Sequence, residues 1–274
     1  MKIAYLGYDV LFPCLEALEE AGCSVMEVFT CRTDDQFEFH REVLAFAKQR
    51  GLCCHVQPIT LEDIHRLRDA GCQAIFCAGY FYKVPIDHSV PIVNVHPAML
   101  PKGRGAWPMP VTILRQLPES GVTLHKMEQA LDAGDILIQQ AFPVGPREDL
   151  ESMTRTICRI AALLCRQVAG NFEHYWNHAT PQGEFEYWPY PGKADATITQ
   201  ATSARQADRI LRAFFGFDCY LAAPDREICV IRGKFRPQEH DLPFGTAVEC
   251  ADGAAAYAVT GGVVVAEQSE VVPL

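Results

Sequence analysis

Short apolar runs alternate with amphipathic stretches along the first part of the chain. An apolar run bounded by polar residues predicts a buried strand, and apolar residues spaced three and four apart predict a helix. The predicted strands are 3–7, 24–30 and 74–78, and the predicted helices are 12–20 and 37–50. This order predicts an α/β fold in which helices cover both faces of a mostly parallel sheet.

The pattern changes towards the end of the chain. An apolar segment, 136–144, precedes a long helical pattern over 150–176, and residues 177–194, rich in Pro, Gly and aromatic residues, predict a linker. The elements predicted after this linker are a helix over 203–215, strands over 228–231, 254–259 and 263–267, and turns at 251–253 and 261–262. Short strands with Gly turns indicate a small, mainly-β, OB-like domain.

We therefore expect three parts, namely a large α/β domain over 1–178, a linker over 179–202 and a small carboxy-terminal β domain over 203–274. A chain of 274 residues is long enough for this division. It has no apolar run of about 18 residues, and residues 1–4 lead into a predicted strand rather than a signal peptide. We expect a cytoplasmic protein. The oligomeric state is open, with a homodimer as one option.

Charge and cysteine content narrow the range of partners. The net charge is −10, and residues 195–274 alone carry 7 Lys or Arg against 11 Asp or Glu. Because proteins that bind nucleic acid are usually basic, this disfavours tRNA as a partner without removing it. The 12 cysteines include no C-x-x-C pair and no zinc spacing, so we expect buried free thiols and no metal.

Two polar residues interrupt an apolar run near the centre of the chain. Asn94 and His96 alternate with valines in the run 92–96. Since successive side chains of a strand point to opposite faces, these two share one face. An unpaired buried amide or imidazole costs roughly 1–3 kcal/mol, so each must find a partner or serve a ligand. Taken singly, each is more often a turn former or a structural residue. Together, before a loop rich in Pro and Gly, they favour a site.

The residues around this run resemble the signature of a known enzyme family. The motifs are Asn94-Val95-His96-Pro97, Leu100-Pro101-Lys102-Gly103-Arg104-Gly105, Gly121-Val122-Thr123-Leu124-His125 and Leu131-Asp132-Ala133-Gly134-Asp135-Ile136. Together they are similar to the folate-dependent formyltransferases, which act on methionyl-tRNA, glycinamide ribonucleotide or amino sugars. The likeness covers residues 1–170, including 3–7 and 78–85, and continues more weakly at 210–214. It implies a Rossmann-like fold and 10-formyltetrahydrofolate as co-substrate.

The resemblance also implies catalytic roles. Formyl transfer to an amine passes through a tetrahedral intermediate whose oxygen becomes negative, and we expect Asn94 and His96 to donate N–H groups to it. We expect Asp132 to keep His96 charged and to help remove the amine proton. Spacing alone leaves Asp135 as a competitor, and the family's pattern favours Asp132. For His125 the alternatives are a supporting role beside the site and simple satisfaction of a buried neighbour.

The same resemblance suggests where ligands bind. It implies that the flat pterin of the folate lies in a slot. The residues that line it are Phe81, Tyr82, Lys83 and Val84 on one side and Glu128, Gln129 and Ala130 on the other. Lys102 and Arg104 are candidates for contacting a phosphate or carboxylate of the acceptor, or are idle surface cations. The turn 7–10 lacks the G-x-G-x-x-G spacing of dinucleotide-binding proteins, so a nicotinamide cofactor is disfavoured.

The acceptor amine is predicted by departures from the family's patterns. The tRNA enzymes enlarge a basic loop after the second strand, whereas residues 30–35 are short and acidic here. The glycinamide ribonucleotide enzymes have a Gly-rich phosphate loop after the first strand, and residues 8–12 do not match it. The hypothesis that remains is a primary amine of a small molecule, with a nucleotide-linked amino sugar preferred. The alternatives are a methionyl-tRNA formyltransferase, a formyltetrahydrofolate hydrolase and, least favoured, a non-catalytic binding module.

Overall fold

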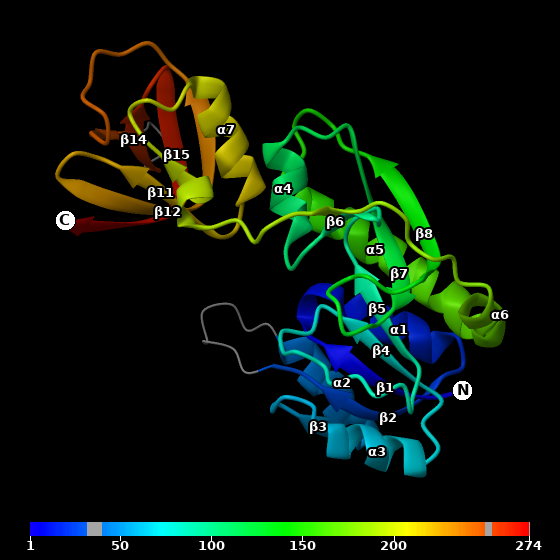
Figure 1. Ribbon diagram of the computed structural model, residues 1–274. Coiled ribbons are helices and arrows are strands. Elements are labelled where there is room, and N and C mark those ends of the chain that lie inside the picture. Colours follow the sequence, from blue (N-terminus) through cyan, green and yellow to red (C-terminus); the bar gives the residue numbers. More distant parts are fainter. Residues whose placement is uncertain (32–39, 250–253, 274) are drawn as a thin grey trace. The chain divides into compact units, whose positions relative to one another are not determined.

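The computed structural model describes residues 1–31, 40–249 and 254–273 (Figure 1). The chain divides into two compact units that are not contiguous in sequence. The first comprises Met1–Gly105, Ser120–Phe142 and Thr154–Tyr187, and the second comprises Ala106–Glu119, Pro143–Met153 and Trp188–Leu274. The three-part division expected from the sequence stays a prediction, because compactness does not show which segments fold independently.

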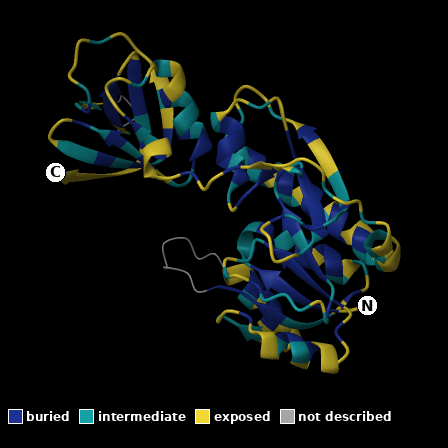
Figure 2. Cartoon of the chain, in the orientation of Figure 1, coloured by how far each residue is buried: buried dark blue, intermediate teal, exposed yellow. Residues whose placement is uncertain are grey.

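A seven-stranded sheet forms the centre of the first unit. Its strand order is β3-β2-β1-β4-β5-β7-β8. The strands are β1 (Lys2–Gly7), β2 (Ser24–Phe29), β3 (Cys53–His55), β4 (Ala74–Ala78), β5 (Ile92–His96), β7 (Glu119–Lys126) and β8 (Ile136–Pro143). The first five are parallel, whereas β7 runs antiparallel to β5. Figure 2 shows β1 and β4 as buried, as their continuous apolar runs predict.

Helices cover this sheet, as the alternating pattern predicted. They are α1 (Phe12–Glu20), α2 (Arg41–Arg50), α3 (Leu61–Asp69), α5 (Leu150–Gly170) and α6 (Phe172–Asn177), with a 3-10 turn η1 (Asp9–Leu11) before α1. The Thr60 side chain caps α3, whose Ile64 and Leu67 pack on Leu6 and Ile75 of the sheet. The neighbouring Tyr5, which points to the opposite face, lies beside cysteines of α1 and α5. The two faces therefore have separate cores.

The second unit is built on a six-stranded sheet of order β10-β11-β12-β15-β14-β13. Its strands are β10 (Thr197–Ile198), β11 (Asp218–Ala222), β12 (Arg226–Pro237), β13 (Ala247–Glu249), β14 (Ala255–Val259) and β15 (Gly262–Pro273). All pairs are antiparallel except β10 with β11. The unit also holds α4 (Pro108–Leu114), the turn η2 (Lys193–Ala196) and α7 (Ala204–Ala213). The predicted fold class, a mostly parallel sheet plus a carboxy-terminal mainly-β part, is confirmed.

Several predicted elements differ from those observed. The helix predicted over 150–176 is interrupted at Asn171, and the strands β12 and β15 are longer than predicted. The segment 177–194 contains the short strand β9 (Glu186–Tyr187), which pairs with β6 (Lys102–Arg104). The turn predicted at 251–253, the start of the helix predicted over 37–50 and most of the loop 30–35 lie outside the described residues. No described helix is long and apolar enough to cross a membrane.

The strand order determines where a ligand can bind. Strand β1 lies between β2 and β4, so the chain reverses its direction of progress across the sheet at this point. In open α/β sheets ligands bind outside the carboxyl ends of the strands near such a reversal. Parallel strands β1, β4 and β5 end at Gly7, Ala78 and His96, on that same edge. The polar face of β5 therefore reaches the edge where a site is expected.

Candidate active site

Strand pairing places Asn94 beside His125. In the antiparallel register of β5 and β7, Asn94 lies opposite His125 and His96 lies opposite Thr123. Side chains directly opposite each other in a sheet share a face and lie within contact distance. The Asn94 Nδ2 atom is 3.1 Å from His125 Nε2. The two strands thus bring together polar residues of two of the sequence motifs.

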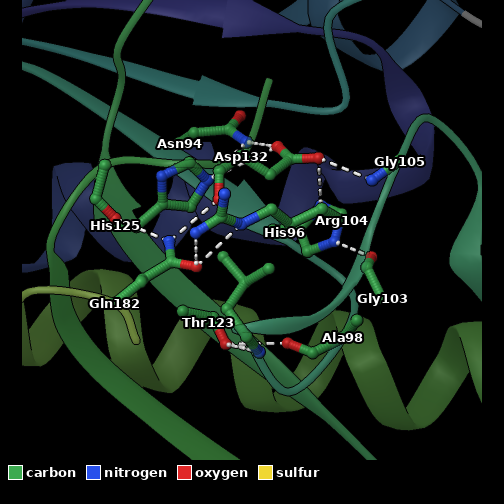
Figure 3. A network of polar contacts seen from close by, with 12 residues as sticks. Asn94, His96, Ala98, Gly103, Arg104, Gly105, Thr123, His125, Asp132 and Gln182 are labelled. Carbon is green, nitrogen blue, oxygen red and sulfur yellow. Dashed lines mark hydrogen bonds and ion pairs between the residues drawn. The ribbon is translucent and has the colours of Figure 1, made fainter. Parts of the chain in front are cut away.

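Asp132 completes the cluster from the loop between β7 and β8 (Figure 3). Its Oδ1 accepts a hydrogen bond from Asn94 Nδ2 at 3.3 Å, and its Oδ2 accepts one from the Gly105 N–H at 3.0 Å. The same carboxylate is 3.6 Å from His96 Nδ1 and 3.6 Å from His125 Nε2. Residues 94, 96 and 132, singled out from the sequence, therefore converge on one point.

The backbone of Asp132 has the left-handed conformation, with φ 51°. This conformation is uncommon for residues other than glycine and clusters at functional sites. Two residues later, a Cβ atom on Gly134 would lie 2.0 Å from the carbonyl oxygen of Lys126. The turn therefore packs against the end of β7 at a distance that only glycine allows.

Asp132 remains a carboxylate at neutral pH. Burial of its carboxyl group raises the pKa. The nearby His125 and His96 and the hydrogen bond from Gly105 together lower the pKa by more, so that it lies below its usual value. The side chain is 5% exposed. A buried negative charge at this position is a strong acceptor for any proton donor that enters the site.

The charge state expected for His96 is corrected. Burial lowers the pKa of His96 below its ordinary value of 6.5, and this effect outweighs the opposite influence of Asp132. The Nε2 atom lies 2.8 Å from the Gly103 carbonyl oxygen, which can only accept, so Nε2 carries the ring proton. The neutral ring therefore presents an unprotonated Nδ1 to the site. Desolvation, which the sequence did not reveal, is the reason that the predicted charged imidazole is wrong.

His125 belongs to the cluster and not merely to the strand behind it. Its Nδ1 lies 2.7 Å from the Lys126 carbonyl oxygen, so Nδ1 carries the ring proton and Nε2 accepts from Asn94. Both protons of the Asn94 amide are therefore directed at His125 and Asp132. This pattern fixes the Asn94 nitrogen, and not its oxygen, as the atom that faces His125 and Asp132. In the opposite orientation the Asn94 oxygen would lie against the Asp132 carboxylate.

Asp135, the competing carboxylate, lies apart from this cluster. Its side chain is 39% exposed and forms an ion pair with Lys126, with an Nζ to Oδ2 distance of 3.4 Å. Its backbone oxygen accepts the Lys126 N–H at 2.9 Å. The residue closes the turn after Asp132, and its carboxylate is paired with Lys126 rather than with an imidazole of the cluster.

The loop that follows His96 is held by Thr123. The Thr123 hydroxyl donates to the Ala98 carbonyl at 2.7 Å and accepts the Leu100 N–H at 3.2 Å. Gln139 donates to the same hydroxyl at 3.1 Å and to the Leu100 carbonyl at 2.9 Å. These bonds fix the start of the loop whose later residues, Gly103 and Gly105, contact His96 and Asp132.

One of the two segments predicted to line a folate slot, 128–130, contacts residues that follow the other segment, 81–84. Gln129 Nε2 donates to the Ile86 carbonyl at 2.9 Å, and a Glu128 carboxylate oxygen lies 3.7 Å from His88 Nε2. Exposure differs along the two segments. Phe81, Lys83, Glu128, Gln129 and Ala130 are exposed, Tyr82 is intermediate and Val84 is buried in the core. Val84 therefore supports the first segment from beneath, whereas the others are accessible to a ligand.

Of the two cations after His96, only Lys102 is exposed. Arg104 is 9% exposed, and its Nε and Nη2 atoms donate to Gln182 Oε1 at 3.0 and 2.8 Å. Its guanidinium lies over the Phe185 ring, 4.2 Å from the centroid. The reading of Arg104 as an idle surface cation is wrong. Gln182 was missed altogether, since the only signal in its segment was that of a linker.

Comparison with known proteins agrees with this site. A family model described as formyl transferase matches residues 62–164. The methionyl-tRNA formyltransferase of Acidiphilium cryptum is 30% identical over 227 residues, which cover 78% of this chain and 74% of that protein. Because this match extends over most of both proteins, it includes the cluster and its flanking elements.

Solved structures share the fold at lower identity. A variant of HypX from Aquifex aeolicus has a TM-score of 0.70 at 17% identity and covers 100% of this chain and 47% of that one. An N-formyltransferase from Helicobacter canadensis, in complex with folinic acid and dTDP-3-aminofucose, has a TM-score of 0.65 at 17% identity and covers 98% and 99%. At this identity the likeness establishes the fold alone.

The fold and the polar cluster define a group-transfer enzyme with a Rossmann-like sheet. The chain belongs to the family of 10-formyltetrahydrofolate-dependent formyltransferases, as the sequence motifs predicted. It is therefore a folate-dependent N-formyltransferase, and the acceptor of the formyl group is the part of its function that the family does not fix.

Proposed function

We propose that this enzyme transfers a formyl group from 10-formyltetrahydrofolate to a primary amine of a small molecule, with Asn94, His96 and Asp132 as catalytic residues. The observation that carries the proposal is the convergence of these three side chains at the carboxyl edge of the sheet. Two hydrogen-bond acceptors and one amide donor around a buried point match what amine formylation requires.

The arrangement assigns a task to each group. The amine attacks the formyl carbon, the new N–C bond forms, and the bond from that carbon to the folate nitrogen breaks. Asn94 redirects one amide proton to the developing oxyanion. The unprotonated Nδ1 of His96 and the Asp132 carboxylate face each other at 3.6 Å and accept the proton that the amine sheds. That proton then passes to the departing nitrogen of tetrahydrofolate.

The folate is proposed to lie between the segments 81–84 and 128–130. Gln129 is hydrogen-bonded to Ile86, two residues after the first segment, and Met127 and Tyr80 pack on the same core cluster as Val84. Exposed Phe81 offers an apolar face to a planar ring. Folinic acid in the complex of the Helicobacter canadensis enzyme, which has the same fold, supports a folate co-substrate.

A nucleotide-linked amino sugar is the proposed acceptor. The net charge of −10 disfavours a large polyanion, and the Helicobacter canadensis enzyme was solved with such a sugar. Lys102, exposed at the start of β6, is the residue proposed to contact a phosphate of the acceptor. A second candidate is methionyl-tRNA, because the relative in Acidiphilium cryptum is named for it.

A transfer assay tests both candidates. The enzyme is incubated with 10-formyltetrahydrofolate carrying a labelled formyl group and with dTDP-amino sugars, hydroxyornithine, methionyl initiator tRNA or buffer alone. We expect label to move to an amino sugar at a rate at least 100-fold above buffer, by the size typical of a positioned acid–base group. Transfer only to tRNA would select the second candidate, and formate release without an amine would show a hydrolase.

A further inference from the structure

One residue with no assigned role joins the buried Arg104 to the turn that carries Asp132. Gln182 lies in the segment after α6, beside the turn, because Thr180 and Ile136 exchange two backbone hydrogen bonds of 2.8 Å. Its Nε2 donates to the Asp132 carbonyl at 2.8 Å and to the Gly134 carbonyl at 2.7 Å (Figure 3). Both protons of this amide are therefore used on the catalytic turn.

The orientation of the Gln182 amide is set by Arg104. A guanidinium can only donate and a backbone carbonyl can only accept, so the amide oxygen must face Arg104 and its nitrogen must face the turn. Arg104 is 9% exposed, and no carboxylate of the described residues forms an ion pair with it. The buried cation thus has the Gln182 oxygen as its acceptor, which keeps the amide from rotating.

The turn that Gln182 holds is the one that needs support. Asp132 has φ 51°, and in that backbone conformation its carboxylate reaches Gly105, Asn94 and His96. The two hydrogen bonds of the Gln182 amide end on the carbonyl groups of Asp132 and Gly134, on either side of Ala133. They therefore oppose a change in the backbone conformation of the turn. Strained backbone persists where the surroundings over-determine it.

We propose that Gln182 is a positioning residue, oriented by Arg104, that holds the Asp132 carboxylate against Gly105, Asn94 and His96. It touches no reacting atom, and its effect on catalysis rests on the role proposed above for Asp132. Its effect on the ionisation of Asp132 and His96 does not depend on that role. The two consequences are therefore measured separately.

Two substitutions separate positioning from simple stability. Gln182→Met keeps the length of the side chain and removes all its hydrogen bonds. Gln182→Glu gives Arg104 a carboxylate partner but loses the two donors to the turn, so we expect it to melt at a higher temperature than the Met variant. Gln206→Ala is the matched control, since it removes side-chain bonds to Ser203 at the start of α7.

The first readout is the titration of Asp132 and His96 by NMR in the ligand-free protein with labelled carboxyl and imidazole carbons. In both Gln182 variants we expect the pKa of Asp132 to rise by about 0.5–1 unit, as the hydrogen bonds that favour the charged form lengthen. The Gln206→Ala protein should titrate like the parent. Unchanged titration of Asp132 in both Gln182 variants overturns the proposal, whatever the acceptor proves to be.

The second readout is turnover with the acceptor that gives the highest rate in the transfer assay. We expect kcat to fall about 10- to 100-fold in both Gln182 variants while KM for the folate changes less than about threefold, the pattern of a lost transition-state interaction. The proposal is also overturned if kcat falls only in proportion to the loss of melting temperature, so that the more stable Gln182→Glu variant turns over at nearly the rate of the parent. A shifted titration with unchanged kcat would instead leave the positioning intact and contradict the catalytic role of Asp132.

Discussion

The Nδ1 atom of His96 and the Oδ2 atom of Asp132 lie 3.6 Å apart, and both side chains are only 5% exposed. Neither atom carries a proton at neutral pH, because Nε2 holds the ring proton and the carboxylate has a lowered pKa. Two buried acceptors that face each other, as Nδ1 and Oδ2 do here, are both satisfied when one donor lies between them. An amine N–H between them satisfies both and loses its proton to the pair.

Removing the donor or the carboxylate should abolish most of the activity. We expect Asn94→Ala and Asp132→Asn to reduce kcat by about 10²–10³, the usual effect of losing one preorganised group at a developing oxyanion. Both changes leave the hydrophobic core untouched, so circular dichroism and melting curves should stay close to those of the parent. Steady-state transfer assays measure the loss.

Asp135→Asn is the matched control for this pair. Asp135 is three residues from Asp132 but pairs with Lys126 at the surface, so its neutralisation should change kcat less than about threefold and melting only slightly. Activity within threefold of the parent in Asn94→Ala or Asp132→Asn would contradict the assigned roles. A large loss in Asp135→Asn would show that the wrong carboxylate was chosen.

The pH dependence of turnover distinguishes a neutral from a charged His96. Burial places the pKa of this imidazole below 6.5, so the base form predominates at neutral pH. We expect kcat to be level above pH 7 and to fall as the pH drops through the lowered pKa of His96. Loss of activity on raising the pH from 6 to 8 would instead show that the charged ring is required.

The same imidazole should make the fold less stable in mild acid. In the unfolded chain His96 has a pKa near 6.5, and in the folded protein the value is lower. Between the two values only the unfolded state binds the proton. The contribution of His96 to the free energy of unfolding is therefore fully present above about pH 6.5, and it declines as the pH falls towards the folded pKa. Denaturant unfolding at pH 7.5 and 5.0 measures the decline.

His96→Gln removes the titrating ring and leaves an amide that can still donate to the Gly103 carbonyl. We expect the difference in unfolding free energy between pH 7.5 and 5.0 to be smaller in this variant than in the parent. Asp132 does not contribute in this range, because its unfolded pKa is 3.8 and its folded pKa is lower. An equal difference in both proteins would mean that His96 titrates normally in the fold.

The sheet and the central cluster were predictable from local patterns. Continuous apolar runs such as that of β4 identify buried parallel strands, and the alternation in β5 places Asn94 and His96 on one face. Short or polar elements were not recognised. Strand β3 has the sequence Cys-Cys-His, which gives no clear period in a short window. Helix α3 does carry Leu61, Ile64 and Leu67 at helical spacing, but it is short and most of its other residues are charged.

What the sequence could not supply depends on burial and on distant pairing. Arg104 has the composition of a surface residue and becomes buried only because Gln182 and Phe185 of a later segment cover it. The charge state of His96 follows from desolvation, which has no local signature. Gln182 is separated from Arg104 by 78 residues, and only the folded chain shows that they meet.

The close approach of Gly134 to Lys126 predicts a strict requirement for glycine. A methyl group at this position would lie 2.0 Å from the Lys126 carbonyl oxygen, and backbone cannot move aside cheaply. We expect Gly134→Ala to lower the free energy of unfolding by about 1–3 kcal/mol or more and to reduce kcat by displacing Asp132. Gly183→Ala is the control, since a methyl group there meets nothing within 4 Å. Chemical denaturation measures the free energy of unfolding, and transfer assays on the same variants measure kcat. Equal values of both quantities in the two alanine variants would show that the turn accommodates a side chain.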